Sequence, residues 1–189
     1  MVMKNLTKRL LTLLFAALLL LSCTAAFSGC NANDPTKKTY SYEFYDNALR
    51  QFYKNNLNSI HNARNVSDNA QLTYYKFWGL STTKAKDEFH YHIMMVYTSI
   101  QSDGTQRTIK VDWMLSGEYD AQYYYDLRDS LPVEALELDE QDTDNDLLLS
   151  FRADFTKLSE EDKARLCKIF FDSYVERYPE ALELVSLEE

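Results

Sequence analysis

The sequence predicts an α+β domain: an antiparallel sheet of about four strands with an N-terminal and a C-terminal helix packed on one face. Residues 89–98 and 107–115 alternate between two rows of side chains, one of them largely apolar, the pattern of paired strands with one buried face. Two other runs, beginning at Tyr42 and Ser159, place apolar residues at three- and four-residue steps, which predicts helices. This order of elements along the chain favours helices on one face of a single sheet.

Composition favours one modest domain behind a targeting segment. The chain has 189 residues without an internal repeat, and 46% of them are hydrophobic, enough for a core without disulfide bonds. Only 4 Gly and 3 Pro interrupt it, which favours long regular elements. We therefore divide it into a signal peptide over 1–29, a tether over 30–41 and a single α+β domain over 42–189.

The first helix is predicted to be followed by a loop and a strand. Residues 62–69 carry no helical period and are expected to form the loop, whereas the aromatic-rich run 72–80 is expected to form the strand. The apolar stripe of the helix comprises Tyr45, Leu49, Phe52, Tyr53, Leu57 and Ile60.

The turn between the two alternating runs decides how they pair. A two-residue loop of Asp103 and Gly104 would mix the polar row of one strand with the apolar row of the other. A three-residue loop with Gly104 in the left-handed conformation pairs Gln101 with Thr105 instead. We predict this second register because it makes one face wholly apolar, through the pairs Tyr97–Ile109, Met95–Val111, Ile93–Trp113 and Tyr91–Leu115.

The C-terminal half is predicted to contain an ambiguous segment, a strand and the last helix. Segment 117–131 could be a helix that begins at an Asp120 cap. An acidic stretch over 134–146 follows, and the apolar run 147–155 is expected to form another strand. Ser159 begins the last helix, because the Ser-Glu-Glu-Asp sequence there resembles a capping box.

The first 30 residues have the order of a secretory signal. Three basic residues lie in 1–10, no charge lies in 10–27, and small residues follow up to Cys30. This stretch resembles the leader of bacterial lipoproteins, in which a Cys thiol receives a diacylglycerol before the leader is cut. The resemblance covers residues 1–30 only. It implies a palmitate-bearing lipid anchor in the cell membrane, with the domain on the extracytoplasmic side.

Two cysteines compete as the lipidation site. Cys23 follows Leu20-Leu21-Ser22, with the favoured Leu three places before it, whereas Cys30 follows Phe27-Ser28-Gly29, with the favoured Gly beside it. We prefer Cys30, since 24–27 still has the character of a signal and 31–35 that of an exposed tether; Cys23 is the alternative. An uncleaved membrane anchor and simple secretion are the other interpretations, because about 18 apolar residues approach the length of a spanning helix.

Charge argues against a nucleic-acid partner. The leader contains three basic and no acidic residues, so the remainder carries 17 basic and 29 acidic residues, a net charge of −12. A surface of that sign repels phosphate backbones and anionic lipid headgroups.

Motifs for enzymatic chemistry are absent from the sequence. Gly79, Gly104 and Gly117 are too far apart for a phosphate-binding loop, and no Gly-x-Ser-x-Gly elbow occurs. Cys167 has no His near it in sequence and is expected to be a core residue, unless Cys23 is the anchor and Cys30 pairs with it. We predict that the protein is not an enzyme; a hydrolase that uses carboxylates is the alternative.

Two patterns suggest metal ligands. In the predicted register His90 and His92 project to the same side as Met114, and imidazole with thioether suits copper. The alternative is a polar strand face beneath a helix or partner. A second set, Asp142, Asp144 and Asp146, resembles the opening of an EF-hand calcium loop, although Leu147 and Ala153 replace the required Gly and Glu. The alternative is a solvated acidic loop.

Four tyrosines follow the hairpin closely: Tyr119, Tyr123, Tyr124 and Tyr125. Tyrosines supply rigid contact area with a polar tip, so these residues are a candidate surface for an envelope protein or glycan; core packing is the alternative. We thus predict a cell-envelope lipoprotein with a non-catalytic binding domain that requires no cofactor, the alternatives being an envelope hydrolase and a calcium- or copper-binding protein.

Overall fold

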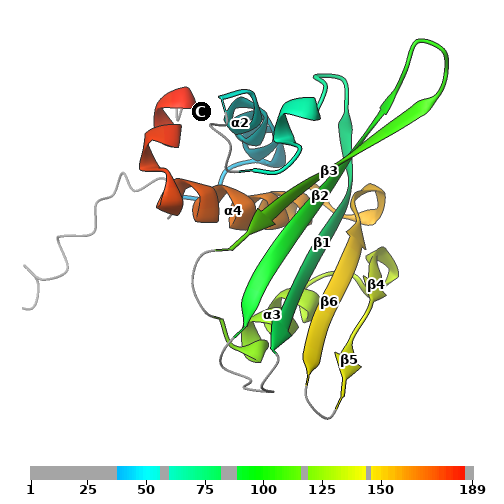
Figure 1. The fold of residues 1–189 in the computed structure, drawn as a ribbon, viewed down its shortest axis with the longest axis vertical. Coiled ribbons are helices and arrows are strands. Elements are labelled where there is room, and N and C mark those ends of the chain that lie inside the picture. Colours follow the sequence, from blue (N-terminus) through cyan, green and yellow to red (C-terminus); the bar gives the residue numbers. More distant parts are fainter. Residues whose placement is uncertain (1–37, 56–59, 82–88, 116–118, 144–145, 186–189) are drawn as a thin grey trace, which may run out of the picture. The chain divides into compact units, whose positions relative to one another are not determined.

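An antiparallel sheet with helices on one face is the architecture of the described residues (Figure 1). The computed structural model describes residues 38–55, 60–81, 89–115, 119–143 and 146–185. The strand order is β3-β2-β1-β6-β4, and β5 also pairs with β6. The strands are β1 (Gln71–Ser81), β2 (His90–Ile100), β3 (Gln106–Met114), β4 (Leu136–Leu138), β5 (Gln141–Asp142) and β6 (Leu147–Asp154).

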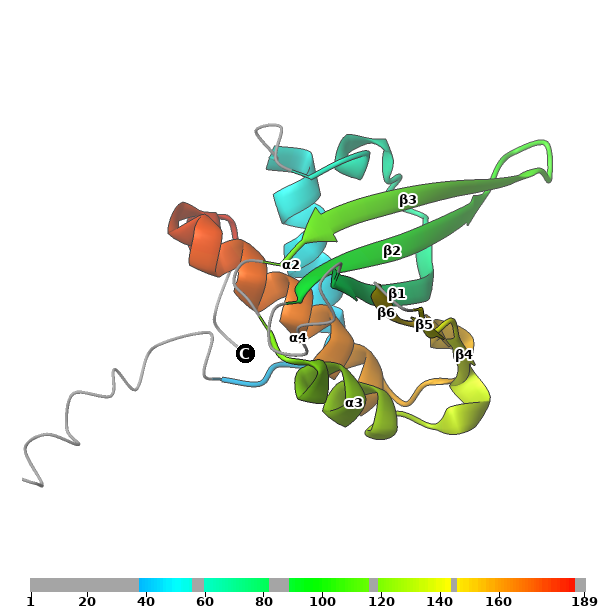
Figure 2. The same ribbon diagram turned by 60° about the horizontal axis from the view of Figure 1, so that its bottom comes forward.

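Helices cover the inner face of this sheet, as the sequence predicts (Figure 2). The helices are α2 (Tyr42–Asn55), α3 (Ala121–Asp129) and α4 (Glu160–Arg177). Short 3-10 turns are η1 (Ala63–Asn65), η2 (Val133–Ala135), η3 (Phe155–Lys157) and η4 (Pro179–Leu184). The N-terminal and C-terminal helices pack together through aromatic rings, and Phe52 of α2 stacks on Phe171 and Tyr174 of α4 with centroids 5.5 and 4.7 Å apart. The predicted α+β class is therefore confirmed.

The β2–β3 hairpin confirms the predicted register. The Gln101 N–H donates to the Thr105 carbonyl over 2.8 Å, and Gly104 has a φ of 82°, the left-handed conformation that a three-residue loop needs. The pairs Tyr97–Ile109, Met95–Val111 and Ile93–Trp113 follow, and the Leu115 N–H donates to the Tyr91 carbonyl. The apolar row of this hairpin faces the helices.

Both predicted helix caps are present. The Asp120 carboxylate accepts the Tyr123 N–H over 3.0 Å, and the helix α3 begins at the next residue, within the ambiguous segment. The Ser159 hydroxyl accepts the Asp162 N–H over 3.1 Å at the start of α4. Each cap satisfies a backbone donor that would have no partner within the helix.

The acidic stretch 134–146 contains two strands that the sequence does not reveal. β4 has three residues and β5 two, and both pair with β6. The sheet therefore exceeds the predicted four strands. Such short, largely exposed segments carry no alternation that a sequence pattern could show.

The inner face of the sheet forms a self-contained core. Its buried hydrophobic residues extend from Tyr40 to Ala181, and the part from residue 39 onward forms one unit. Trp113 of β3 donates its indole N–H to the Ser173 hydroxyl of α4 over 3.0 Å. Gly79 of β1 lies under the Tyr91 ring, where a Cβ would be only 2.4 Å from ring carbons. We therefore expect this part to fold without the leader.

The predicted signal peptide, most of the tether and both candidate lipidation sites, Cys23 and Cys30, lie outside the described residues. None of the described helices is long and apolar enough to cross a membrane.

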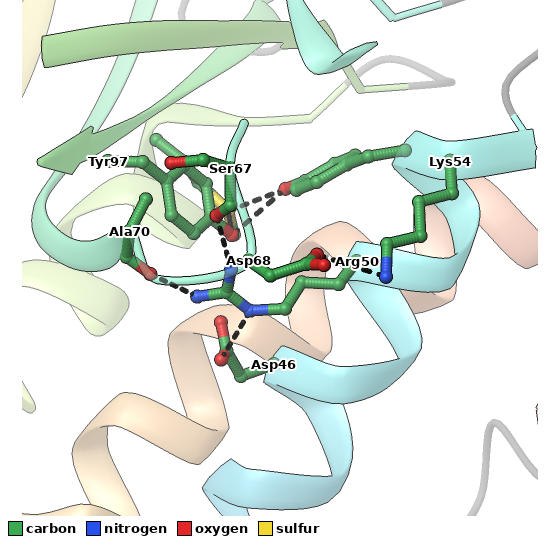
Figure 3. Close-up of polar contacts among 9 residues, drawn as sticks. Asp46, Arg50, Lys54, Ser67, Asp68, Ala70 and Tyr97 are labelled. Carbon is green, nitrogen blue, oxygen red and sulfur yellow. Dashed lines mark hydrogen bonds and ion pairs between the residues drawn. The ribbon is translucent and has the colours of Figure 1, made fainter. Parts of the chain in front are cut away.

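Arg50 joins α2 to the segment before β1 (Figure 3). Its guanidinium donates to the carbonyls of Ser67 and Ala70 over 3.2 and 2.5 Å and to the Asp46 carboxylate over 2.8 Å. The group also lies 5.4 Å from the centre of the Tyr97 ring. The side chains of Arg50 and Asp46 are only 14% and 19% exposed, so loss of one partner would leave a poorly solvated charge.

We expect Arg50→Met to lower the free energy of unfolding by about 3 kcal/mol, the usual cost of breaking a buried ion pair. Lys54→Met, one turn along the same helix, is the matched control. Lys54 pairs with Asp68, but these side chains are 53% and 80% exposed, so its loss should cost less than about 1 kcal/mol. Urea denaturation of both variants measures the difference, and equal losses would contradict a structural role for Arg50.

Candidate functional site

The outer face of the sheet carries the candidate site. Figure 2 shows the helices on one side of the strands, and no helix covers the other side within the described ranges. We call the outward side chains of β1, β2, β3 and β6 the open face. It holds a groove of about 700 Å³. The groove is lined by Thr73, Tyr74, Lys76, Met94, Val96, Thr98, Gln106, Thr108, Lys110, Arg152, Asp154 and Thr156.

The floor of the groove is apolar and its sides are polar. Met94 and Val96 of β2 project into it from the middle of the sheet. Met94 lies opposite Lys76 on β1, and Val96 lies opposite Tyr74 on β1 and Lys110 on β3. A groove of this volume is within the usual range for small-molecule sites.

Two cations are direct neighbours across the open face. Lys76 of β1 and Arg152 of β6 are cross-strand partners. The Arg152 guanidinium lies 3.6 Å from the centre of the Tyr74 ring and donates to the Glu137 carboxylate over 3.1 Å. Lys76 Nζ lies 5.7 Å from the Trp78 ring. Like charges directly opposite each other destabilise a sheet, and Glu137 of β4, which is opposite Arg152 on its other side, offsets part of this repulsion.

The one carboxylate that lines the groove is already engaged. Asp154 accepts the Thr156 hydroxyl over 2.6 Å and the Thr156 N–H over 3.0 Å, and its other oxygen lies 3.6 Å from Lys157 Nζ. The hydrogen bond from the Thr156 hydroxyl lowers the pKa of Asp154. Lys76, Lys110 and Arg152 therefore outnumber the acids that line the groove, in a protein of net charge −9.

The predicted copper ligands lie on the open face but outside the groove. His92 is opposite Met114, as predicted, and its ring stacks on Trp78 with centroids 5.1 Å apart. Burial lowers the pKa of His92. His90, the first residue of β2, is opposite Leu80. No three His, Cys, Asp or Glu side chains in the described part of the chain come together as metal ligands.

The described ends of the predicted calcium loop lie where β5 pairs with β6. Asp142 pairs with Leu147, and the Thr143 N–H donates to the Asp146 carbonyl over 2.9 Å. Asp144 lies outside the described residues. Calcium binding at Asp142, Asp144 and Asp146 stays a prediction.

The tyrosine cluster packs largely into the inner side of the molecule. Tyr124 is fully buried in α3 and donates its hydroxyl to Glu140 over 2.8 Å, which favours the core-packing alternative for this residue. Tyr123 contacts the Phe77 ring at 5.9 Å, and Tyr119 stacks on Tyr123 at 4.7 Å. Tyr125 lies beside the Arg128 guanidinium at 4.9 Å. Their partial burial favours packing as their main role.

Catalysis by Cys167 and a ligand site beside Arg50 have little geometric support. Cys167 is fully buried, and burial raises the pKa of its thiol well above the ordinary range, which disfavours the thiolate. A hollow of about 530 Å³ beside Arg50 contains Asp46, Lys54 and Asp68, but these charges pair as described above. Two smaller hollows beside Arg50 also have more cations than carboxylates in their lining, but there Arg50 and Lys54 pair with Asp46 and Asp68. The groove of the open face, at about 700 Å³, is therefore the candidate site.

Sequence reasoning missed Lys76, Lys110, Arg152 and Tyr74. Alternation along β2 and β3 predicts an outward row that includes Lys110, but the neighbours of β1 cannot be read from the sequence. Only the pairing of β1 with β6 brings Lys76 and Arg152 together across 76 residues of chain.

Comparison with family profiles, with curated proteins and with solved structures found no match to this chain. The functional argument therefore rests on the geometry of the open face and on the leader sequence.

We expect an NMR titration of His92 to give a midpoint below the ordinary pKa of 6.5, because its burial beside Trp78 disfavours the charged ring. Trp78→Ala should return the midpoint toward 6.5, whereas His61→Gln should not move it. Since the folded-state pKa is below the unfolded-state value, His92 stabilises the fold above pH 6.5, and this contribution is lost as the pH falls through the folded-state pKa. A midpoint at or above 6.5 would contradict burial of the ring.

Proposed function

We propose that this protein is a lipid-anchored component of the cell envelope whose extracytoplasmic domain works by binding, and that its ligand occupies the open face. The groove on the uncovered side of the sheet is the observation that carries this proposal. A sheet face with an apolar floor and protruding cations can hold a ligand while the opposite face supplies the core.

The leader supports the envelope location. Its basic start, uncharged apolar run and Gly29-Cys30 end resemble a lipoprotein signal. The first described helix starts at Tyr42, which leaves about a dozen residues after Cys30 as a tether. Such a tether would keep the domain within a few nanometres of the membrane.

Binding is favoured over catalysis by the state of the carboxylates. A glycosidase or similar hydrolase needs two carboxyl groups that face one substrate. Asp154 is the one acidic residue that lines the groove, and its hydrogen bonds hold it as a cap for the η3 turn. An activity that uses paired carboxylates therefore has no support at this site.

We expect labelled palmitate to be incorporated into the full-length protein in its producing cell and to be lost in Cys30→Ala. Cys167→Ala is the matched control, because Cys167 is buried in the core and should not affect labelling. Cys23→Ala should retain the label. Loss of label in Cys23→Ala alone would move the anchor to Cys23, and no label in the wild type would contradict lipid anchoring.

We expect a photo-crosslinking amino acid at Thr108 to capture an envelope ligand in the living cell. Thr108 is exposed and lines the groove. The same amino acid at Glu43, exposed on α2 at the other side of the sheet, is the matched control and should give no specific product. Products at Glu43 but not at Thr108 would contradict a ligand on the open face.

A further inference from the structure

We propose that the open face binds a phosphate monoester carried on an apolar chain, the chemistry of a lipid phosphate. Lys76 and Arg152 would hold the phosphate, and Met94 and Val96 would contact the apolar chain. This inference rests on the proposed function, since it names the class of ligand for the same groove.

The adjacent cations point to an anion with more than one charge. Lys76 and Arg152 are directly opposite on neighbouring strands, where Cβ atoms are about 5 Å apart. Among the described residues the only salt bridge of this pair is from Arg152 to Glu137, whose side chain is 71% exposed, so it screens the pair weakly. A phosphate monoester carries about −1.5 to −2 charges near pH 7 and can accept hydrogen bonds from both cations at once.

Arg152 is already oriented for this role. Its guanidinium is stacked on Tyr74, and its contact with Glu137 uses Nη1, which leaves other N–H donors for a ligand. A guanidinium held by an aromatic ring loses less conformational entropy on binding than a free one. The pair thus has one fixed donor and, in Lys76, one flexible donor.

The floor of the groove supplies the apolar half of the site. Met94 lies beside Lys76, and Val96 follows two residues along the same strand face. An apolar chain along this floor would run from the cation pair toward Lys110, which is opposite Val96. Methionine adapts to flexible apolar ligands because its side chain is unbranched and polarisable.

The charge of the whole protein restricts where such a ligand can bind. The net charge after the leader is −12, so most of the surface repels a phosphate. The open face is a local exception, because three cations line the groove against one carboxylate that is already hydrogen-bonded. A long nucleic acid would also meet the repelling surface around the groove, whereas a single phosphate on an apolar chain would not.

The test uses residues 31–189, which contain the self-contained core, and dodecyl phosphate below its micelle concentration as the probe. Isothermal titration calorimetry should give a dissociation constant that rises at least tenfold in Lys76→Gln and in Arg152→Gln. Lys54→Gln, which removes an exposed cation on α2, should leave it unchanged. Val96→Ser should weaken the binding of dodecyl phosphate, because it removes apolar contact area. Thermal melting of each variant checks that the fold is retained.

Three further probes separate the parts of the ligand. Inorganic phosphate should bind much more weakly, because it lacks the apolar chain, and dodecyl maltoside should not bind, because it lacks the charge. Equal binding of dodecanoate would overturn the phosphate assignment in favour of a carboxylate, and equal binding of dodecyl maltoside would overturn the role of the cations. If no probe binds while Thr108 still crosslinks in the cell, the lipid-phosphate inference fails and the proposed binding function stands. If no probe binds and Thr108 gives no crosslink, both the lipid-phosphate inference and the proposed binding function are contradicted.

Discussion

The separation of the sheet into an apolar inner row and a polar outer row is the constraint on which this structure depends. Each long strand places alternate residues on opposite faces, and the inner row is buried against α2, α3 and α4. This row is rich in large rings, including Tyr75, Phe77, Tyr91 and Phe151. A one-residue slip in any strand would exchange the rows, so the same packing that makes the core also orients the open face.

Aromatic packing of this density tolerates little change of shape. Gly79 shows this most clearly, since the Tyr91 ring occupies the space that its side chain would need. Arg50 then attaches the segment before β1 to α2, so that β1 enters the sheet from a defined position. The groove floor on β2 and the cation pair on β1 and β6 are therefore supported by a rigid layer behind them.

The open face is unusual because it places two cations, Lys76 and Arg152, side by side. Neighbouring cations on a sheet cost stability, and an acidic protein has carboxylates with which to neutralise them. Yet Asp154 caps a turn, and Glu137, which pairs with Arg152, has a side chain that is 71% exposed. The arrangement is consistent with a surface that is completed by an anionic ligand.

Local patterns in the sequence were sufficient for much of the fold. Alternation and the position of Gly104 predicted the β2–β3 register, and Asp120 and Ser159 marked the starts of α3 and α4, because turns and caps depend on neighbouring residues. The short strands β4 and β5 escaped prediction because two or three exposed residues carry no period. The sequence left Tyr124 open between surface and core because a tyrosine can fill a core or face solvent, and only its packing decides which.

The sequence by itself determined the elements, the hairpin register and the leader pattern, since each of these depends on residues within a few positions of one another. Only the tertiary structure decided the neighbours of β1, and with them the pairing of Lys76 with Arg152 and the shape of the groove. The physical reason is that contacts between distant strands depend on how buried rows pack against the helices, which no local pattern encodes.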